Sequence, residues 1–217
     1  NNAEALKHLE SVISTYPKSE VLGLAHYHAG EASLNGKEYP RARNHFAKAA
    51  AHAKLPDDFK ETANLRLGET QGLTSQWAES EGTYQAFLAT YPESEWLRRA
   101  QLGLGWAREN LKKYSEAITA YRKVLAGGER DETAARAQFQ LGECHFAMKQ
   151  YDEALRELLK VEINYAYPEW ITRSMLEMGR VLEGKNEKVS AIDQYELLIE
   201  KYPDSQPATV ARKRIEE

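Results

Sequence analysis

The sequence predicts an all-α protein in which a pair of helices repeats about every 37 residues. The composition favours helix, because 29 alanines and 23 leucines stand against only 14 valines and isoleucines together. Apolar residues fall at helical spacing in two stretches per repeat, with polar or turn residues between them. A glycine recurs at one register, at Gly30, Gly68, Gly105, Gly142 and Gly179.

Each glycine belongs to a longer template. A small residue precedes it by five positions, a second small residue follows after twelve, and a large one follows after sixteen. Glycine inside a helix costs about 1 kcal/mol relative to alanine, so its recurrence indicates a demand of packing. Small residues let two helices approach closely, and the large residue fills the space beside them. The large residues are Phe46, Tyr84, Tyr121, Leu158 and Tyr195.

The template resembles the tetratricopeptide repeat (TPR). The segments LGWARENLKKYSEAI (104–118) and LGECHFAMKQYDEAL (141–155) match it best. The resemblance covers essentially the whole chain, and it implies a right-handed TPR superhelix, an α-solenoid of antiparallel helix hairpins.

On this template residues 1–217 form a single solenoid fragment. Residues 1–20 are expected to be the second helix of a truncated repeat, so that the chain begins inside a repeat, and 209–217 the start of a following helix. Between them we expect five full repeats, at 23–60, 61–97, 98–134, 135–171 and 172–208.

Three inter-repeat steps share a Tyr-Pro-x-Ser pattern, at 16–20, 91–95 and 202–206. Proline ends one helix, and Ser19, Ser94 and Ser205 are expected to cap the next. The pattern is similar to bacterial cell-envelope TPR proteins, namely the periplasmic partner of the Tol-Pal system and the lipoprotein of the outer-membrane assembly machine. Because other bacterial TPR proteins share this step, the location stays open between the periplasm or cell envelope and the cytoplasm.

Composition argues against several partners. The net charge is −4, with lysine and arginine scattered among glutamates, so no basic face is expected to follow nucleic acid. No apolar run is long enough to insert directly into a membrane. The single cysteine, Cys144, lies at a packing register and leaves no internal disulfide.

No motif indicates catalysis or a cofactor. The glycines stand singly within helices, and neither a phosphate-binding loop nor a nucleophile elbow occurs. Five of six histidines lie between residues 8 and 52. His45 and His52 are expected to share a helix face, whereas His26 and His28 point apart, so we predict solvated or partly packed imidazoles and no metal site.

The TPR resemblance places ligand contacts on the first helix of each repeat, facing a concave groove. Its registers mark Arg99, Trp106, Arg136, Phe139, Glu143, Arg173, Leu176 and Arg180 as a protein-binding groove. Arg99, Arg136 and Arg173 recur every 37 residues and would form a ladder. Two alternatives stay open: each arginine pairs with a groove glutamate such as Glu143, and Trp106 packs against a neighbouring helix.

The sequence therefore predicts a non-catalytic scaffold that binds a peptide or partner segment in its groove, with a bacterial envelope assembly as one setting. An acidic peptide would suit the arginines. Alternatives are a structural module that assembles into homo-oligomers, or a regulatory segment of a larger enzyme. The partner protein is not identified by these residues.

Overall fold

A computed structural model describes residues 2–216, and within this range it contains twelve α-helices and no strand. The predicted all-α class is confirmed. The helices fall into two compact units with their border between Leu111 and Lys112. This border lies inside the repeat predicted for 98–134, and the division into five repeats stays a prediction.

The helices alternate between two kinds. A helices carry the periodic glycine or its register, and B helices carry the large residue that follows it. Unit 1 contains α1 (Asn2–Thr15), α2 (Leu22–Asn35), α3 (Tyr39–Ala50), α4 (Asp57–Leu73), α5 (Trp77–Thr90) and α6 (Leu97–Asn110). Unit 2 contains α7 (Tyr114–Leu125), α8 (Glu132–Ala147), α9 (Tyr151–Asn164), α10 (Pro168–Gly184), α11 (Lys188–Lys201) and α12 (Gln206–Glu216). Even-numbered helices are therefore A helices and odd-numbered helices are B helices.

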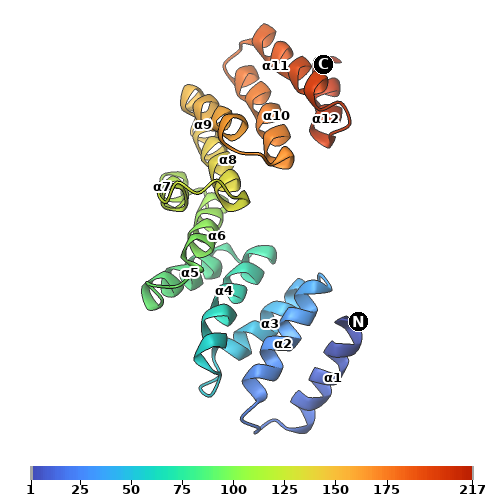
Figure 1. Ribbon diagram of the computed structural model, residues 1–217, viewed down its shortest axis with the longest axis vertical. Helices are drawn as coiled ribbons and strands as arrows, with labels where there is room; N and C mark the ends of the chain where they lie inside the picture. Colours follow the sequence, from blue (N-terminus) through green and yellow to red (C-terminus); the bar gives the residue numbers. More distant parts are fainter. Residues whose placement is uncertain (1, 217) are drawn as a thin grey trace. The chain divides into compact units, whose positions relative to one another are not determined.

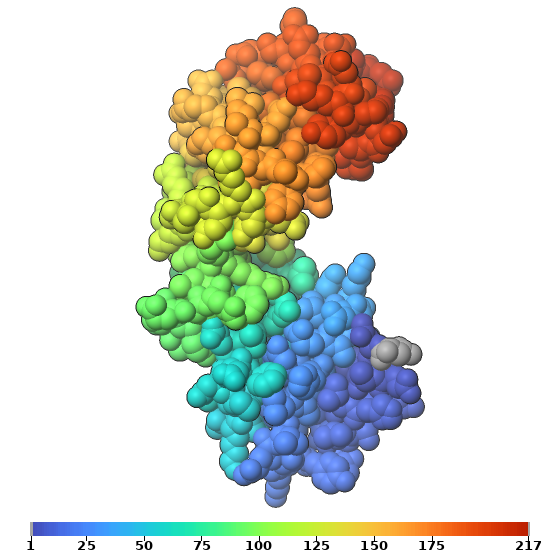
Figure 2. All heavy atoms as spheres, viewed as in Figure 1, coloured from blue at the N-terminus to red at the C-terminus, as the bar shows by residue number. Residues whose placement is uncertain are grey.

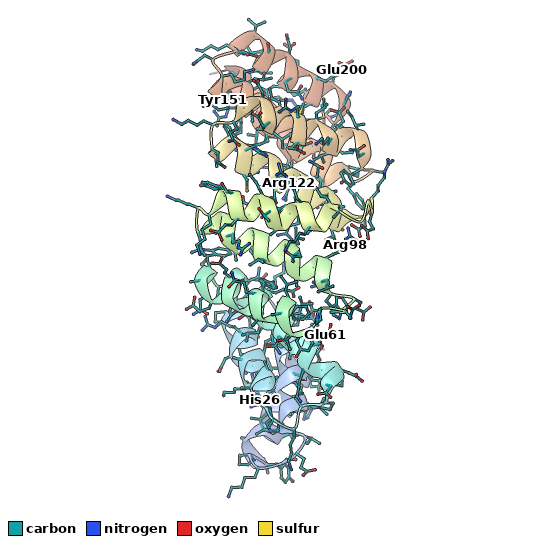
Figure 3. The ribbon with its side chains drawn as sticks, turned by 90° about the vertical axis from the view of Figure 1, so that its left-hand side faces the viewer. His26, Glu61, Arg98, Arg122, Tyr151 and Glu200 are labelled. Atoms are coloured by element: carbon teal, nitrogen blue, oxygen red, sulfur yellow. The ribbon has the colours of Figure 1, made fainter. Side chains whose placement is uncertain are left out.

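Within each unit a helix packs against its neighbours in the chain, and A helices also contact one another (Figure 1). The contacts between A helices join α2 to α4 and α4 to α6 in unit 1, and α8 to α10 and α10 to α12 in unit 2. Tyr151, at the start of α9, and Glu200, near the end of α11, lie at opposite edges of unit 2 (Figure 3). The spaces between neighbouring helices of a unit are filled by side chains (Figure 2). Each unit thus has a continuous layer of A helices.

The periodic glycines make room for the large B-helix residue, as the template predicts. A Cβ added to Gly30 would lie 2.7 Å from Cε1 of Phe46, and one added to Gly68 would lie 2.9 Å from Cε1 of Tyr84. Gly142 faces Leu158 and Gly179 faces Tyr195 in the same way. Real Cβ atoms do not approach so closely, and therefore a side chain at these positions forces the helices apart.

The turn from an A helix to a B helix has a left-handed residue. Among residues 2–216, the non-glycine residues with positive φ are Lys37, Ser75, Lys112, Lys149 and Asn186, at φ between 59° and 64°. At the turn after α8, the N–H of Lys149 donates to Phe146 at 2.8 Å and that of Gln150 donates to His145 at 2.9 Å. These two bonds close the helix end in a Schellman motif, which ordinarily has glycine at the left-handed position.

Replacing Lys149 by glycine is expected to raise the free energy of unfolding by about 0.5–1 kcal/mol, because glycine adopts positive φ without steric cost. Lys149 is exposed, so little packing is lost. Urea denaturation should show a higher midpoint at an unchanged slope. The control is Lys149→Ala, which removes the same long side chain but keeps the strain. An equal gain from alanine would contradict this explanation.

The serines of the Tyr-Pro-x-Ser steps differ in what they bind. Ser205 Oγ accepts the N–H of Ala208 at 3.2 Å and caps α12, as predicted. Ser19 Oγ accepts the N–H of Val21 at 3.4 Å, and Ser94 Oγ accepts that of Trp96 at 2.9 Å. Val21 and Trp96 precede the first helical residue, and so the predicted caps at Ser19 and Ser94 are wrong: these hydroxyls close the turn ahead of the helix.

Candidate functional site

The A helices of unit 1 are joined by a chain of ion pairs that includes Arg99. The guanidinium of Arg99 on α6 pairs with Glu69 on α4, and its Cζ lies 5.8 Å from the ring centroid of Trp96. Arg66 on α4 pairs with Glu69 and with Glu31 on α2, each at 2.9 Å. Arg99 is thus bound to a glutamate of the preceding A helix. This agrees with the alternative in which each arginine of the ladder pairs with a glutamate.

Arg66 is a residue of this surface that the sequence did not mark. Burial opposes its charge, but the field of Glu69 and Glu31 outweighs burial and raises the pKa of the Arg66 guanidinium. Its register, two residues before Gly68, is outside those transferred from the family. The available signal was the spacing of three residues between Arg66 and Glu69, which places both on one helix face.

In unit 2 two of the predicted arginines meet at one tryptophan. The Cζ of Arg173 on α10 lies 5.0 Å from the ring centroid of Trp170, and that of Arg136 on α8 lies 6.0 Å from it. Arg173 also pairs with Glu169 at 2.9 Å, one helical turn away. The indole Nε1 donates to Glu132 at 3.4 Å. A cation near an aromatic face is worth about 0.5–1 kcal/mol at exposed sites, so Trp170 orients both arginines.

Phe139 lies in the core between α8 and α10. It is only 8% exposed, and its ring centroid lies 5.7 Å from that of Trp170. The same pair of registers meets in unit 1, where Tyr27 and Phe59 are 5.0 Å apart. Phe139 therefore packs one A helix on the next and is not an exposed part of the predicted groove.

Trp106 packs against neighbouring helices, as the second alternative expects. Its ring makes an edge contact with Trp77 on α5, with centroids 4.9 Å apart and an interplanar angle of 78°. A Cβ added to Gly72 on α4 would lie 2.9 Å from Cζ3 of Trp106. Trp106 as a whole is half-buried.

The remaining predicted residues are spread over α8 and α10. Glu143 is half-buried on α8, and Leu176 packs beside the core cluster of Met175 and Tyr195. Arg180 is exposed on α10 and pairs with Glu177 at 2.7 Å. The structure thus brings Arg136, Phe139 and Arg173 together at Trp170, whereas Leu176 and Arg180 lie further along α10 and make contacts of their own.

A surface cleft of about 620 Å³ adjoins this cluster in unit 2. Its walls are the start of α10, which contributes Arg173, and the turn between α11 and α12. The other lining residues include Pro168, Lys201, Tyr202, Pro203 and Pro207. Tyr202-Pro203 is identified as a turn from the sequence, but the sequence does not predict that this turn forms a wall. Predicting the cleft requires knowing which turn lies beside α10.

Neither a metal centre nor a membrane span is found in the part of the chain that the structure describes. No group of three histidine, cysteine or acidic side chains there is arranged to hold a metal ion. The expectation that His45 and His52 share a helix face is wrong, because α3 ends at Ala50. No helix between residues 2 and 216 combines the length and the apolar character needed to cross a bilayer.

Comparison with known protein families supports the repeated helix hairpins described above. A sequence model described as the tetratricopeptide repeat matches residues 65–132 and again 102–169, and a second model of the same description matches 173–205. These matches together span more than half of the chain. The chain is a TPR protein. TPR proteins are in general scaffolds for protein–protein interaction, with an extended surface formed by stacked repeats.

Solved TPR structures share this fold at low sequence identity. MamA (41–end) from Desulfovibrio magneticus RS-1 has a TM-score of 0.69 and 16% identity, over 84% of this chain and 97% of that one. YrrB, described as a TPR protein with an unusual peptide-binding site, has a TM-score of 0.63 and 18% identity, over 94% of this chain and 97% of that one. BtubC (BKLC) from P. vanneervenii has a TM-score of 0.69 and 13% identity, over 99% of this chain and 89% of that one. At these identities the likeness concerns the fold alone. A search of curated protein sequences finds no match to this TPR chain.

Proposed function

We propose that this TPR protein is a non-catalytic scaffold that binds a peptide or an extended segment of a partner protein on its A helices. The observation that carries the proposal is the cluster in unit 2, where Arg136 and Arg173 share the indole of Trp170 beside the 620 Å³ cleft. Arginine and tryptophan are frequent binding hot spots, and an open cleft next to them suits an extended chain. The peptide-binding site named for YrrB supports the same kind of partner.

The exposure of the ion pairs favours unit 2 over unit 1. In unit 1 Arg66 and Arg99 are already matched by Glu31 and Glu69 on neighbouring A helices, and an acidic ligand would have to break these pairs. In unit 2 the partner of Arg173 is Glu169, which is 61% exposed. An exposed pair contributes only about 0–1 kcal/mol, so a ligand carboxylate can replace Glu169 at little cost. The proposed ligand is therefore an acidic peptide.

A peptide-display selection on the immobilised chain tests this proposal. We expect acidic peptides to be enriched, and their affinity, measured by fluorescence anisotropy, to fall roughly tenfold in the double variant Arg136→Glu/Arg173→Glu. The matched control is Arg122→Glu/Arg156→Glu, which makes the same charge change at exposed positions on B helices. Circular dichroism should show that both variants keep their helices. Equal affinities for the two variants would rule out this surface.

The setting that we propose is a bacterial envelope assembly, with five full repeats in a single solenoid. Support for the setting comes from the Tyr-Pro-x-Ser steps at 16–20, 91–95 and 202–206. Fractionation of the cells that naturally make the protein tests it. Recovery with cytoplasmic markers would exclude the envelope.

A further inference from the structure

Two histidines form a buried pair in unit 1. His26 on α2 and His45 on α3 are 5% and 7% exposed, and their Nδ1 atoms lie 3.0 Å apart. The ring centroids are 5.3 Å apart with an interplanar angle of 42°. Figure 3 labels His26 among the helices of unit 1. Solvated or partly packed imidazoles were expected from the sequence, whereas these two are core residues that bond to each other.

A carboxylate that offsets a positive charge on the pair lies near His45 but not near His26. Oε1 of Glu10, on α1, lies 3.5 Å from Nε2 of His45, but Glu10 is also bound by Arg41. Lys48 on α3 and His52, which follows the end of α3, repel a positive charge on His26. Lys48 and Arg41 repel a positive charge on His45. The ring of His52 lies against Gly23 on α2. No carboxylate among the groups acting on His26 offsets a positive charge there.

The hydrogen bond between the two Nδ1 atoms depends on protonation. In the neutral pair one Nδ1–H donates and the other Nδ1 accepts, and a first proton preserves this arrangement but adds a buried charge. A second proton makes both nitrogens donors, so the bond is lost and two cations face each other. Burial lowers the pKa of His26 to about 4. It also lowers the pKa of His45, against the opposing effect of Glu10.

We propose that His26 and His45 form an acid-sensitive switch that loosens the α2–α3 hairpin when the surroundings become acidic. In the closed state α2 also packs on α1, where Leu6 is buried with Ala29 and Ala32. Opening of the hairpin frees both imidazoles to take up protons in water. It also weakens the support of the α1–α2 contact.

The lowered pKa values of His26 and His45 mean that the closed hairpin is less stable at acidic pH. Folded-state pKa values below the ordinary 6.5 mean that neutral imidazoles stabilise the closed hairpin above about pH 6.5, and this stability is lost as the pH falls toward 4. For His26 alone, linkage predicts that the open fraction rises roughly 30-fold between pH 7.5 and pH 5. The folded-state pKa of His45 is lowered as well, so proton uptake by His45 on opening increases this factor.

Amide hydrogen exchange of the whole chain, corrected for the intrinsic rate, tests the switch at pH 7.5 and pH 5. We expect corrected opening in α2 and α3 to rise roughly 30-fold at pH 5, while α10 and α11, which contain no histidine, change little. The variant His26→Asn/His45→Asn keeps an amide–amide bond that does not titrate, and its rise should stay below about threefold. The matched control His8→Asn/His28→Asn removes two exposed histidines and should behave as the wild type.

An equal rise in wild type and in His26→Asn/His45→Asn would overturn the proposal, as would no rise in wild type. If the double variant does not fold, imidazole proton resonances of the wild type decide the matter. A midpoint for His26 well below 6.5 supports the switch, and one at 6.5 or above overturns it.

Discussion

Replacing Phe46 by alanine is expected to lower the free energy of unfolding by about 3–5 kcal/mol. Phe46 is fully buried and its ring fills the space left by Gly30. Alanine removes this apolar contact and leaves a cavity between α2 and α3, since two helices held by several neighbours cannot collapse fully onto it. Urea denaturation monitored by circular dichroism measures the loss.

A double-mutant cycle separates this contact from general loss of volume. Gly30→Ala should cost about 1–3 kcal/mol by overpacking, because the new Cβ meets the Phe46 ring. Combining it with Phe46→Ala, which removes the ring that the new Cβ meets, should reduce the cost of Gly30→Ala. Additive effects would mean that the glycine is required for another reason.

Replacing Arg108 by methionine is expected to cost about 3–5 kcal/mol. Arg108 Nε on α6 donates to Oε1 of Glu81 on α5 at 3.1 Å, and Glu81 is only 7% exposed. Methionine keeps much of the aliphatic stem but removes the positive charge, so the buried carboxylate of Glu81 loses its ion pair with Arg108. Thermal and urea unfolding at pH 7 should both report the loss.

The control for Arg108 is the double variant Glu81→Leu/Arg108→Met, which removes both charges and keeps apolar volume. It should recover most of the lost stability, because replacing a whole buried pair by apolar residues is often neutral. A double variant as unstable as Arg108→Met would indicate that the loss comes from packing of the arginine stem.

The fold could be predicted largely from the sequence, because its determinants are local and periodic. Gly30 and Phe46 are sixteen residues apart, and the same spacing recurs through the chain, so a single template predicts both the helices and their contact. The left-handed residue at Lys149 could not be predicted, since lysine has no preference for positive φ. That conformation is imposed by the hairpin rather than by the residue.

The candidate site was predictable only in part. The register of Arg136 and Arg173 follows from the repeat, and the structure brings both to Trp170. Whether a residue at a groove register is exposed depends on its neighbour in the next repeat, which explains why Phe139 is buried against Trp170. His26 and His45 lie at the registers of Gln138 and Glu157, which also bond to each other in unit 2. The residue types at these registers differ between repeats, and periodicity therefore gave no signal for a histidine pair.

The ion pairs from Glu31 through Arg66 and Glu69 to Arg99 have a consequence for how the repeats are ordered. The backbone template is common to the repeats, so shape alone would allow them to be exchanged along the chain. Charge is more restrictive, because Arg66 on α4 pairs with a glutamate of the A helix before it and Glu69 pairs with an arginine of the A helix after it. Exchanging α4 with α6 would separate both pairs. The side chains of these helices thus favour their present order, whereas the template sets only their spacing.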